Sequence, residues 1–167
     1  DIENGKFIGW SDPRLPTIAG LSGTGIQSEA LRNFWIELGV TQKDIAVPLA
    51  SLYSHNIKII DDDAPRIAFI RDPVELSLEN IDDDIIELPT HPNNPKLGSR
   101  IINLEDRKVY VERTDLQDDK LRLKEFGDFD IDGSTATLIS KERTDKRKII
   151  HWVSKNSSYD ARMTQVL

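Results

Sequence analysis

The sequence divides around one stretch, His91-Pro92-Asn93-Asn94-Pro95-Lys96-Leu97-Gly98-Ser99-Arg100. Its two prolines, two asparagines and one glycine cannot continue a helix or a central strand, so the stretch predicts a surface loop. The cations Lys96 and Arg100 make this loop a candidate site for a polyanion. An ordinary connection between two strands is the alternative, and composition alone leaves both interpretations open.

Composition excludes several kinds of site. The chain has 167 residues and no cysteine, which excludes disulfides, thiolate metal ligands and cysteine nucleophiles. No apolar run approaches the roughly 20 residues that span a membrane, and no signal peptide opens the sequence. We therefore expect a soluble cytoplasmic protein of one or two small domains, with no membrane partner.

Charge is distributed unevenly along the chain. Residues 1–90 hold 7 Lys and Arg against 16 Asp and Glu, a balance of −9 within a net charge of −7. Residues 91–155 hold 14 against 12, a balance of +2. Phosphate binding needs a locally positive surface rather than a positive total. The second half therefore permits an RNA contact without demanding one.

Before residue 65 the apolar spacing is helical. We expect a short helix after Pro16, a second over residues 29–38 with Ser28 as its N-cap, and a third after Pro48. Apolar residues at helical spacing are predicted to form the buried stripes of the second and third helices: Leu31, Phe34, Trp35, Leu38, Leu49, Leu52, Tyr53 and Ile57. The run Asp61-Asp62-Asp63 is interpreted as a solvated helix end, with a metal site as the alternative.

From Pro65 onward the apolar period changes to two. The strand candidates are residues 67–70, 74–78, 85–88, 100–104, 108–112, 121–124, 135–139 and 149–153. Short strands after a helical start predict an α+β fold, in which a helical piece packs at one end of a small antiparallel β-barrel. The residues after Lys155 show no clear element.

The sequence contains no evident catalytic constellation. No Ser/His/Asp set has a recognised spacing, and no glycine-rich phosphate loop follows a strand. The three histidines, His55, His91 and His151, are isolated and are not spaced as metal ligands, so we interpret them as structural. Trp152, beside His151, is interpreted as a core residue. We assign no catalytic residue and no metal ligand to this chain.

Several phrases taken together resemble one family. Residues 9–21, Gly-Trp-Ser-Asp-Pro-Arg-Leu-Pro-Thr-Ile-Ala-Gly-Leu, resemble the G-W-D-D-P-R-[LMF]-P-T motif of glutamyl- and glutaminyl-tRNA synthetases of the archaeal and eukaryotic type. Four further phrases match in the family's order: Gly39-Val40-Thr41, Asp63-Ala64-Pro65-Arg66, the His91–Arg100 stretch and Ile150-His151-Trp152-Val153-Ser154. Because no long insertion interrupts the second half, the chain is more similar to an archaeal glutamyl enzyme than to a glutaminyl one.

The resemblance implies a division of the chain. Residues 1–66 would be the helical stem-contact subdomain, and residues 67–167 the anticodon-binding β-barrel region with an incomplete distal barrel. The family's catalytic domain, which uses ATP with Mg, would precede Asp1, so this chain would hold no cofactor. As a monomer it would bind glutamate tRNA, and glutamine tRNA as an option, for a glutamate–tRNA ligase. The same part of a glutaminyl-tRNA synthetase and a free-standing RNA-binding module are the alternatives.

The resemblance also implies roles for single residues. Arg100 closes the family's H-P-N-x-P-x-x-G-S-R phrase and is expected to meet the anticodon, since a guanidinium can stack on a splayed base or bond its edge. Lys96 is expected to meet phosphate. Asn93 would contact RNA or cap its own turn, and Arg14 would contact the tRNA stem or pair with Asp12.

One basic run and two departures complete the comparison with the family. Lys146, Arg147 and Lys148 are interpreted as a hairpin tip that stays solvated or, as the weaker option, contacts RNA. Leu21-Ser22-Gly23-Thr24-Gly25 stands where the family has Leu-Arg-Arg-Arg-Gly, which removes cations from the expected stem contact. Ser157-Ser158-Tyr159-Asp160-Ala161 stands where the family continues with a His-Ala-Leu-Pro-type phrase.

Overall fold

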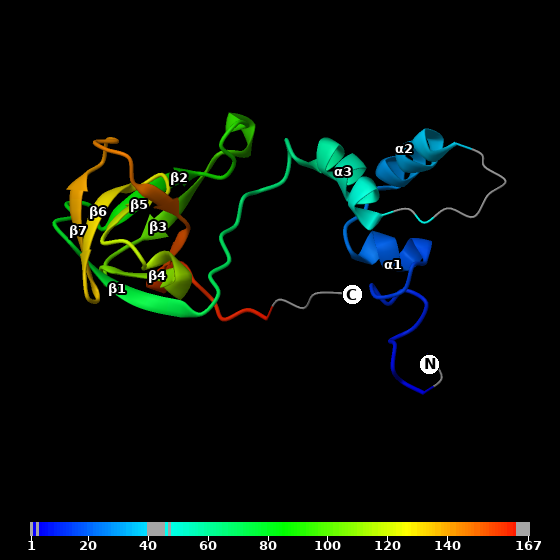
Figure 1. Cartoon of the computed structure of the whole chain (residues 1–167), viewed down its shortest axis with the longest axis horizontal. Helices are drawn as coiled ribbons and strands as arrows, with labels where there is room; N and C mark the ends of the chain where they lie inside the picture. Colours follow the sequence, from blue (N-terminus) through cyan, green and yellow to red (C-terminus); the bar gives the residue numbers. More distant parts are fainter. Residues whose placement is uncertain (1, 3, 40–45, 47, 163–167) are drawn as a thin grey trace. The chain divides into compact units, whose positions relative to one another are not determined.

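The computed structural model describes residues 2, 4–39, 46 and 48–162 (Figure 1). It divides the chain into two compact units with a boundary between Ala64 and Pro65, whereas the sequence predicts the boundary after residue 66. Arg66 belongs to the second unit, where its N–H donates to the carbonyl of Thr90 across 2.9 Å. Val40 and Thr41, which the family phrase includes, lie outside the described residues.

The first unit is helical and has a small core. Its helices are α1 (Ile18–Gly23), α2 (Ser28–Leu38) and α3 (Leu49–Ile60), as the apolar spacing predicts. Four residues form the buried core: Ile26, Ala30, Phe34 and Leu52. The predicted buried stripes are too wide, because short helices packed along one face enclose only part of each apolar surface. Their exposed members are Trp35, Leu49, Tyr53 and Ile57.

The start of α2 is fixed differently from the sequence prediction. Ser28 is the first residue of the helix, and its N-cap is Gln27, which makes no side-chain capping bond. The buried side chain of Asn56 takes over part of this role from α3. Its Oδ1 accepts the Gln27 N–H at 2.8 Å, and its Nδ2 donates to the carbonyl of Gly25 at 3.1 Å. The prediction of Ser28 as N-cap is therefore wrong.

The second unit, from Pro65 to Ala161, is built from strands. A two-stranded ribbon consists of β2 (Ile85–Pro89) and β3 (Ser99–Asn103). A seven-stranded sheet has the order β8-β5-β6-β7-β1-β4-β9. Its strands are β1 (Pro73–Glu79), β4 (Lys108–Glu112), β5 (Lys120–Leu123), β6 (Gly127–Asp132), β7 (Thr135–Ser140), β8 (Lys148–Ile150) and β9 (Trp152–Ser154).

The two edges of the large sheet are neighbours in sequence. β8 pairs parallel to β5 at one edge, and β9 pairs antiparallel to β4 at the other. Only His151 separates β8 from β9, so a single bent segment belongs to both edges and the sheet must curl. Trp152 reinforces this bend, because its indole N–H donates to the carbonyl of Lys124 across 3.0 Å.

The strand predictions are confirmed for most candidates and corrected for three features. Residues 67–70 form no strand, Gly127–Asp132 is an additional one, and 149–153 is divided at His151. The sheet is mixed rather than antiparallel, since β1–β7 and β5–β8 are parallel pairs. Hydrogen-bonded pairing among the described residues does not close into a barrel, so the α+β class holds while the barrel stays a prediction.

The core of the β unit lies inside the curled sheet and under the ribbon. Fifteen buried side chains form it, among them Phe129, Leu121, Leu123 and Val109, which are fully buried. Phe126 packs edge-on against Phe129, with ring centroids 5.1 Å apart, and lies 5.2 Å from Trp152. Trp152 is thus a core residue, as the sequence predicts, and its indole N–H makes one hydrogen bond to the main chain. No helix in the described residues is long and apolar enough to cross a membrane.

Candidate nucleic-acid interface

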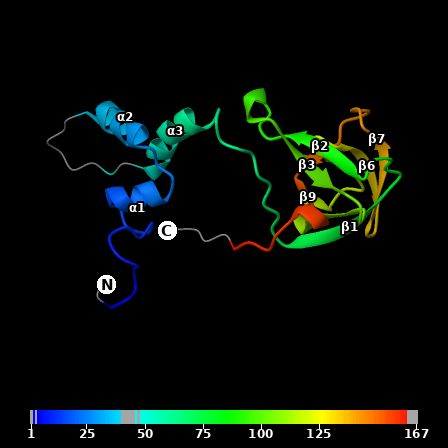
Figure 2. The ribbon, with the colours of Figure 1, turned by 180° about the vertical axis from the view of Figure 1, so that it is seen from behind.

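Residues 91–98 form the tip of the β2–β3 ribbon (Figure 2), and Ser99 and Arg100 begin β3. The Thr90 N–H donates to the carbonyl of Gly98 at 3.0 Å and closes the tip, while Gly98 takes the left-handed φ of 68° that favours glycine. Between them Pro95–Leu97 makes one 3₁₀ turn. The surface loop predicted from this stretch is confirmed for residues 91–98, while Ser99 and Arg100 belong to β3.

Two side chains hold the loop in shape from within. His91 is buried, and its Nδ1 accepts the Asn93 N–H at 3.1 Å. Asn94 caps the 3₁₀ turn, because its Oδ1 accepts the Lys96 N–H at 3.1 Å. The side chains of Asn93 and Lys96 are exposed at the tip. Both therefore remain candidates for an RNA contact, with Asn93 free of the capping role that Asn94 fills.

Arg100 lies on the inner face of the ribbon rather than at its tip. Leu88 is its cross-strand partner, and side chains on alternate positions of each strand share a face. Arg100 is only half-buried, but its Nε is inaccessible and has no hydrogen-bond partner. Its Nη1 donates to the carbonyl of Arg66 across 2.8 Å. This contact orients the guanidinium along the mouth of a small depression.

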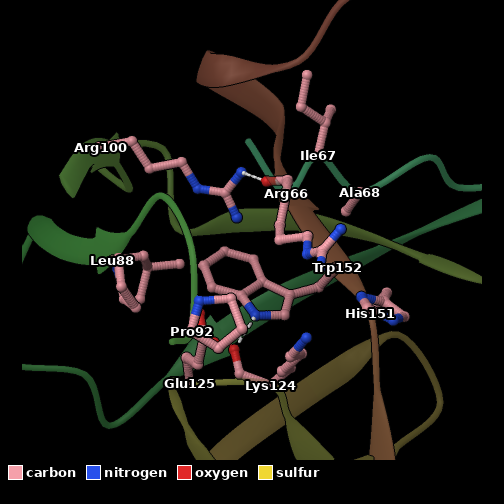
Figure 3. Close-up of a pocket in the computed structure, with 11 residues that line it drawn as sticks. Arg66, Ile67, Ala68, Leu88, Pro92, Arg100, Lys124, Glu125, His151 and Trp152 are labelled. Carbon is pink, nitrogen blue, oxygen red and sulfur yellow. Dashed lines mark hydrogen bonds between the residues drawn. The ribbon is translucent and has the colours of Figure 1, made fainter. Parts of the chain in front are cut away.

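We call this depression the Trp152 slot (Figure 3). Its volume is about 50 Å³, and apolar groups of Leu88, Pro92 and Trp152 form part of its wall. Its charged and titratable lining residues are Arg66, Arg100, Lys124, Glu125 and His151. In the view of Figure 3, the two arginines lie above the indole of Trp152, and Glu125 and Lys124 lie below it.

A larger groove adjoins the slot. It has a volume of about 890 Å³ and shares Leu88, Arg100 and Trp152 with the slot. Phe69, Tyr110 and Tyr159 add aromatic surface to its lining. A flat ring could therefore rest in the groove while its edge enters the slot, which is how proteins commonly hold an unstacked RNA base.

The basic run at residues 146–148 does not form a uniform cationic tip. Arg147 is buried, and its guanidinium donates to the carboxylates of Asp145 at 2.7 Å and Asp130 at 2.6 Å and to the carbonyl of Phe129 at 2.7 Å. Lys148 pairs with Asp115 at 2.9 Å. The exposed position expected for Arg147 is therefore wrong, because three acceptors draw its side chain inward. Lys146 is exposed and has no ion-pair partner in the described part of the chain.

A buried carboxylate anchors the segment that carries Lys146. Asp128 is fully buried in β6 and accepts hydrogen bonds from the Thr144 N–H and O–H at 2.8 Å and from Arg122 at 2.5 Å. Burial works to raise the pKa of Asp128, but these donors outweigh it and lower the pKa from 3.8 to about 2. The carboxylate is thus charged at neutral pH, and the segment after β7 is tied to the sheet.

Arg14 in the helical unit is engaged within its own segment. Its guanidinium forms a two-pronged contact with the buried carboxylate of Asp12, with Nε–Oδ1 at 2.9 Å and Nη2–Oδ2 at 2.8 Å. The same Nη2 donates to the carbonyl of Lys6, and the guanidinium lies 4.8 Å from the ring centroid of Phe7. The hydrogen bonds from Arg14 lower the pKa of Asp12 well below its usual range. The ion pair between Arg14 and Asp12, one of the two expected options, is therefore present. The contact of Arg14 with the tRNA stem remains a prediction.

Sequence reasoning missed most members of the slot. Arg66 stands in one of the matching family phrases, and His151 and Trp152 stand in another, yet none of the three was selected as a binding residue. Lys124 and Glu125 belong to none of the matching family phrases. The β5–β6 turn brings them beside Arg100, which the sequence does not show. No group of three His, Asp or Glu suited to a metal ion occurs in the ranges that the structure describes, the Asp61-Asp62-Asp63 run included.

This geometry defines a class of protein: a β domain with an exposed loop, an aromatic groove and a slot lined by basic groups. Comparison with known proteins identifies the class further. Residues 64–145 match the family described as the anti-codon binding domain of class I tRNA synthetases (E and Q). The chain belongs to this family through its β unit.

Several archaeal proteins are similar to the chain. The chain is 38% identical over 163 residues to a glutamate–tRNA ligase of Methanosarcina mazei, a match that covers 91% of this chain and 28% of that protein. It is 37% identical to one of Archaeoglobus fulgidus and 34% identical to one of Thermococcus kodakarensis, with 95% and 94% of the chain covered. The chain therefore spans a little under a third of the length of these curated relatives.

Proposed function

We propose that this chain binds tRNA as the anticodon-reading part of a glutamate–tRNA ligase. The observation that carries the proposal is the slot in which Arg100, Arg66 and Trp152 lie together, within a unit that belongs to an anticodon-binding family. Guanidinium groups beside an apolar wall suit an unpaired base, which offers a flat face and a hydrogen-bonding edge. Lys96 at the ribbon tip would meet the backbone phosphates.

The activity of the whole protein is part of the same proposal. It would join glutamate to glutamate tRNA with ATP and Mg, which the catalytic part would hold, as a monomer in the cytoplasm. Support comes from the relatives that match more than 90% of this chain, which are all glutamate–tRNA ligases. The residues described here would supply recognition of the tRNA and none of the chemistry.

We further propose that the curled sheet is the family's anticodon-binding barrel. Its two edge strands, β8 and β9, are joined through His151, so the covalent chain links the two edges that hydrogen bonds leave apart. Hydrogen-bonded closure into a barrel would remove the exposed edges of the sheet, which are otherwise sites of unwanted pairing. A stable barrel would also give the slot a rigid support.

The test is a titration of the chain with glutamate tRNA, glutamine tRNA and an unrelated tRNA at two salt concentrations. We expect the tightest binding to glutamate tRNA and a loss of affinity with salt, because phosphate contacts release counterions. Arg100→Ala should lower discrimination among the three by about tenfold, the loss of roughly 1–3 kcal/mol expected of a base-reading arginine. Arg113→Ala, which removes an exposed arginine paired with Asp72 in the same unit, is the matched control.

The outcomes separate the alternatives. Equal binding of all three tRNAs would contradict anticodon reading and indicate a general RNA-binding module. Preference for glutamine tRNA would assign the chain to a glutaminyl enzyme. No binding at low salt would overturn the proposal.

A further inference from the structure

Glu125 stands out among the residues of the Trp152 slot because it is the single acid in its lining. The other titratable lining residues are Arg66, Arg100, Lys124 and His151. Glu125 is exposed and makes no hydrogen bond or ion pair within the described part of the chain. An unpaired carboxylate in a basic depression is an acceptor available to a ligand.

The backbone at Glu125 is also unusual. Its φ is 63°, in the left-handed region, at the tight turn where the Phe126 N–H donates to the carbonyl of Leu123 at 3.0 Å. Glycine, asparagine and aspartate take this conformation far more readily than glutamate. A residue held in a less favourable conformation beside a binding slot is a candidate for a functional role.

We propose that Glu125 recognises the exocyclic amine of a cytosine in the anticodon loop. This inference rests on the proposed function and names the base chemistry of the same site. A cytosine edge offers a donor, the N4 amine, next to the acceptors N3 and O2. Glu125 accepts from the amine, and Arg100 or Arg66 donates to O2, because all three residues line the Trp152 slot.

The size of the slot agrees with recognition of an edge. A water-sized group needs about 10–15 Å³ of such space, so a volume of about 50 Å³ admits a few atoms and excludes a whole nucleotide. The ring rests in the adjoining groove. Uracil shares O2 with cytosine but differs at two groups of this edge: it presents O4, an acceptor, where cytosine presents its amine, and its N3 carries a hydrogen where the N3 of cytosine is an acceptor. Two acceptors would then face each other across the slot, and the site rejects uracil.

The genetic code supplies the cytosine. Glutamate codons begin with guanine, so every glutamate anticodon ends in cytosine, whereas glutamine anticodons end in guanine. The last anticodon base is therefore the position that separates the two tRNAs. A cytosine-reading slot would give the β unit a direct means of selecting the glutamate partner.

The experiment measures dissociation constants of the full chain for anticodon stem–loop hairpins by fluorescence anisotropy. One hairpin carries the glutamate anticodon, and a second replaces its last cytosine by uracil. The unaltered chain should bind the cytosine hairpin about 10- to 100-fold more tightly, the discrimination given by one well-formed base contact. Glu125→Gln should bring this ratio close to one, because an amide can donate to uracil O4 as well as accept from cytosine N4. Glu105→Gln, at an exposed glutamate outside the slot, should leave the ratio unchanged.

A second variant separates folding from recognition. Glu125→Gly relieves the left-handed backbone, so it should raise the midpoint of thermal unfolding while it abolishes the preference for cytosine. If the chain discriminates and both Glu125 variants still do so, this proposal is overturned while the proposed function stands. If the unaltered chain binds neither hairpin at low salt, the proposed function fails and this assignment fails with it.

Discussion

Arg100 and Arg66 are joined by a hydrogen bond of 2.8 Å from Nη1 to a main-chain carbonyl, across 34 residues of sequence. The contact ties the inner face of the β2–β3 ribbon to the extended segment that precedes β1. It also leaves the Arg100 Nε buried and unpartnered. The residue best placed to read a base thus has one donor committed to the fold, and its structural and recognition roles can be separated by the choice of substitution.

Arg100→Lys should separate these two roles. Lysine keeps the positive charge, but it lacks the planar fork with which arginine meets a base edge. We expect the overall affinity for glutamate tRNA at low salt to change by less than about threefold, and discrimination between tRNAs to fall by about tenfold. Binding titrations with matched and unmatched tRNAs measure both quantities.

The control for Arg100→Lys is Arg107→Lys, at an exposed arginine that lies 3.7 Å from Asp84. It should change neither affinity nor discrimination, because exposed ion pairs contribute little. Equal effects of the two substitutions would remove Arg100 from the recognition site.

Local chemistry explains why the loop was predictable. At the ribbon tip, Pro95 starts a turn, Asn94 caps it and Gly98 supplies a positive φ. These are the roles that each residue type favours in turns. The strands on either side follow the apolar alternation for the same reason. A segment whose conformation depends on its own residues can be inferred from them.

Long-range partners explain the errors. Residues 67–70 alternate as a strand does, but a strand also needs a neighbour to complete its hydrogen bonds, and this segment has none in the described residues. Gly127–Asp132 was not among the predicted strands although its residues alternate, and Asp128 is buried because Arg122 and Thr144 satisfy it from other elements. Neither partnership is visible in a sequence window.

The candidate site also combines features that follow from local sequence with features that depend on long-range contacts. The exposure of Lys96 was predictable because the loop displays it, while its contact with phosphate stays a prediction. The inward direction of Arg100 depends on its register opposite Leu88, and the burial of Arg147 depends on acceptors at Phe129 and Asp130. Glu125 lies at the site only because the β5–β6 turn of the folded chain places it there.

Lys96→Ala should weaken RNA binding without regard to sequence. The exposed ammonium at the ribbon tip is assigned to phosphate, and one lost phosphate contact lowers the slope of log K against log salt by roughly 0.7–1. Affinities for glutamate tRNA and an unrelated tRNA should fall by the same factor. Titrations at several salt concentrations give the slope, and a change in discrimination would argue for a base contact instead.

Arg147→Met should destabilise the β unit. The substitution leaves Asp130, Asp145 and the Phe129 carbonyl without their shared donor. We expect the free energy of unfolding to fall by roughly 2–4 kcal/mol. This is below the largest losses caused by breaking a buried ion pair, because the two carboxylates are about half exposed. Urea unfolding measures it. Lys146→Met, one residue away and exposed, should stay within about 0.5 kcal/mol.

Asp128 should make stability depend on pH in the acid range. Its pKa is about 2 in the folded chain and ordinarily 3.8, so the unfolded chain binds the proton first as pH falls. The stabilisation is therefore complete above about pH 5 and is lost progressively as pH falls from 4 toward 2. Asp128→Asn should flatten this part of the curve of unfolding free energy against pH. Asp132→Asn, at the exposed end of the same strand, should leave the curve unchanged.

Gly127→Ala should test how closely β6 and β7 approach at the start of β6. A Cβ at Gly127 would lie 2.8 Å from the carbonyl oxygen of Ser140 and 2.6 Å from Leu138 Cδ1, next to the register shift at Asp128. The leucine methyl can move, but the carbonyl belongs to the paired backbone. We therefore expect the free energy of unfolding, measured with urea, to fall by roughly 1–3 kcal/mol. Gly133→Ala is the matched control. It meets no atom within 4 Å and carries only the strain of a φ of 59°, about 1 kcal/mol. A smaller loss at Gly127 than at Gly133 would show that the two strands separate readily at this point and that the anchor at Asp128 does not hold them together.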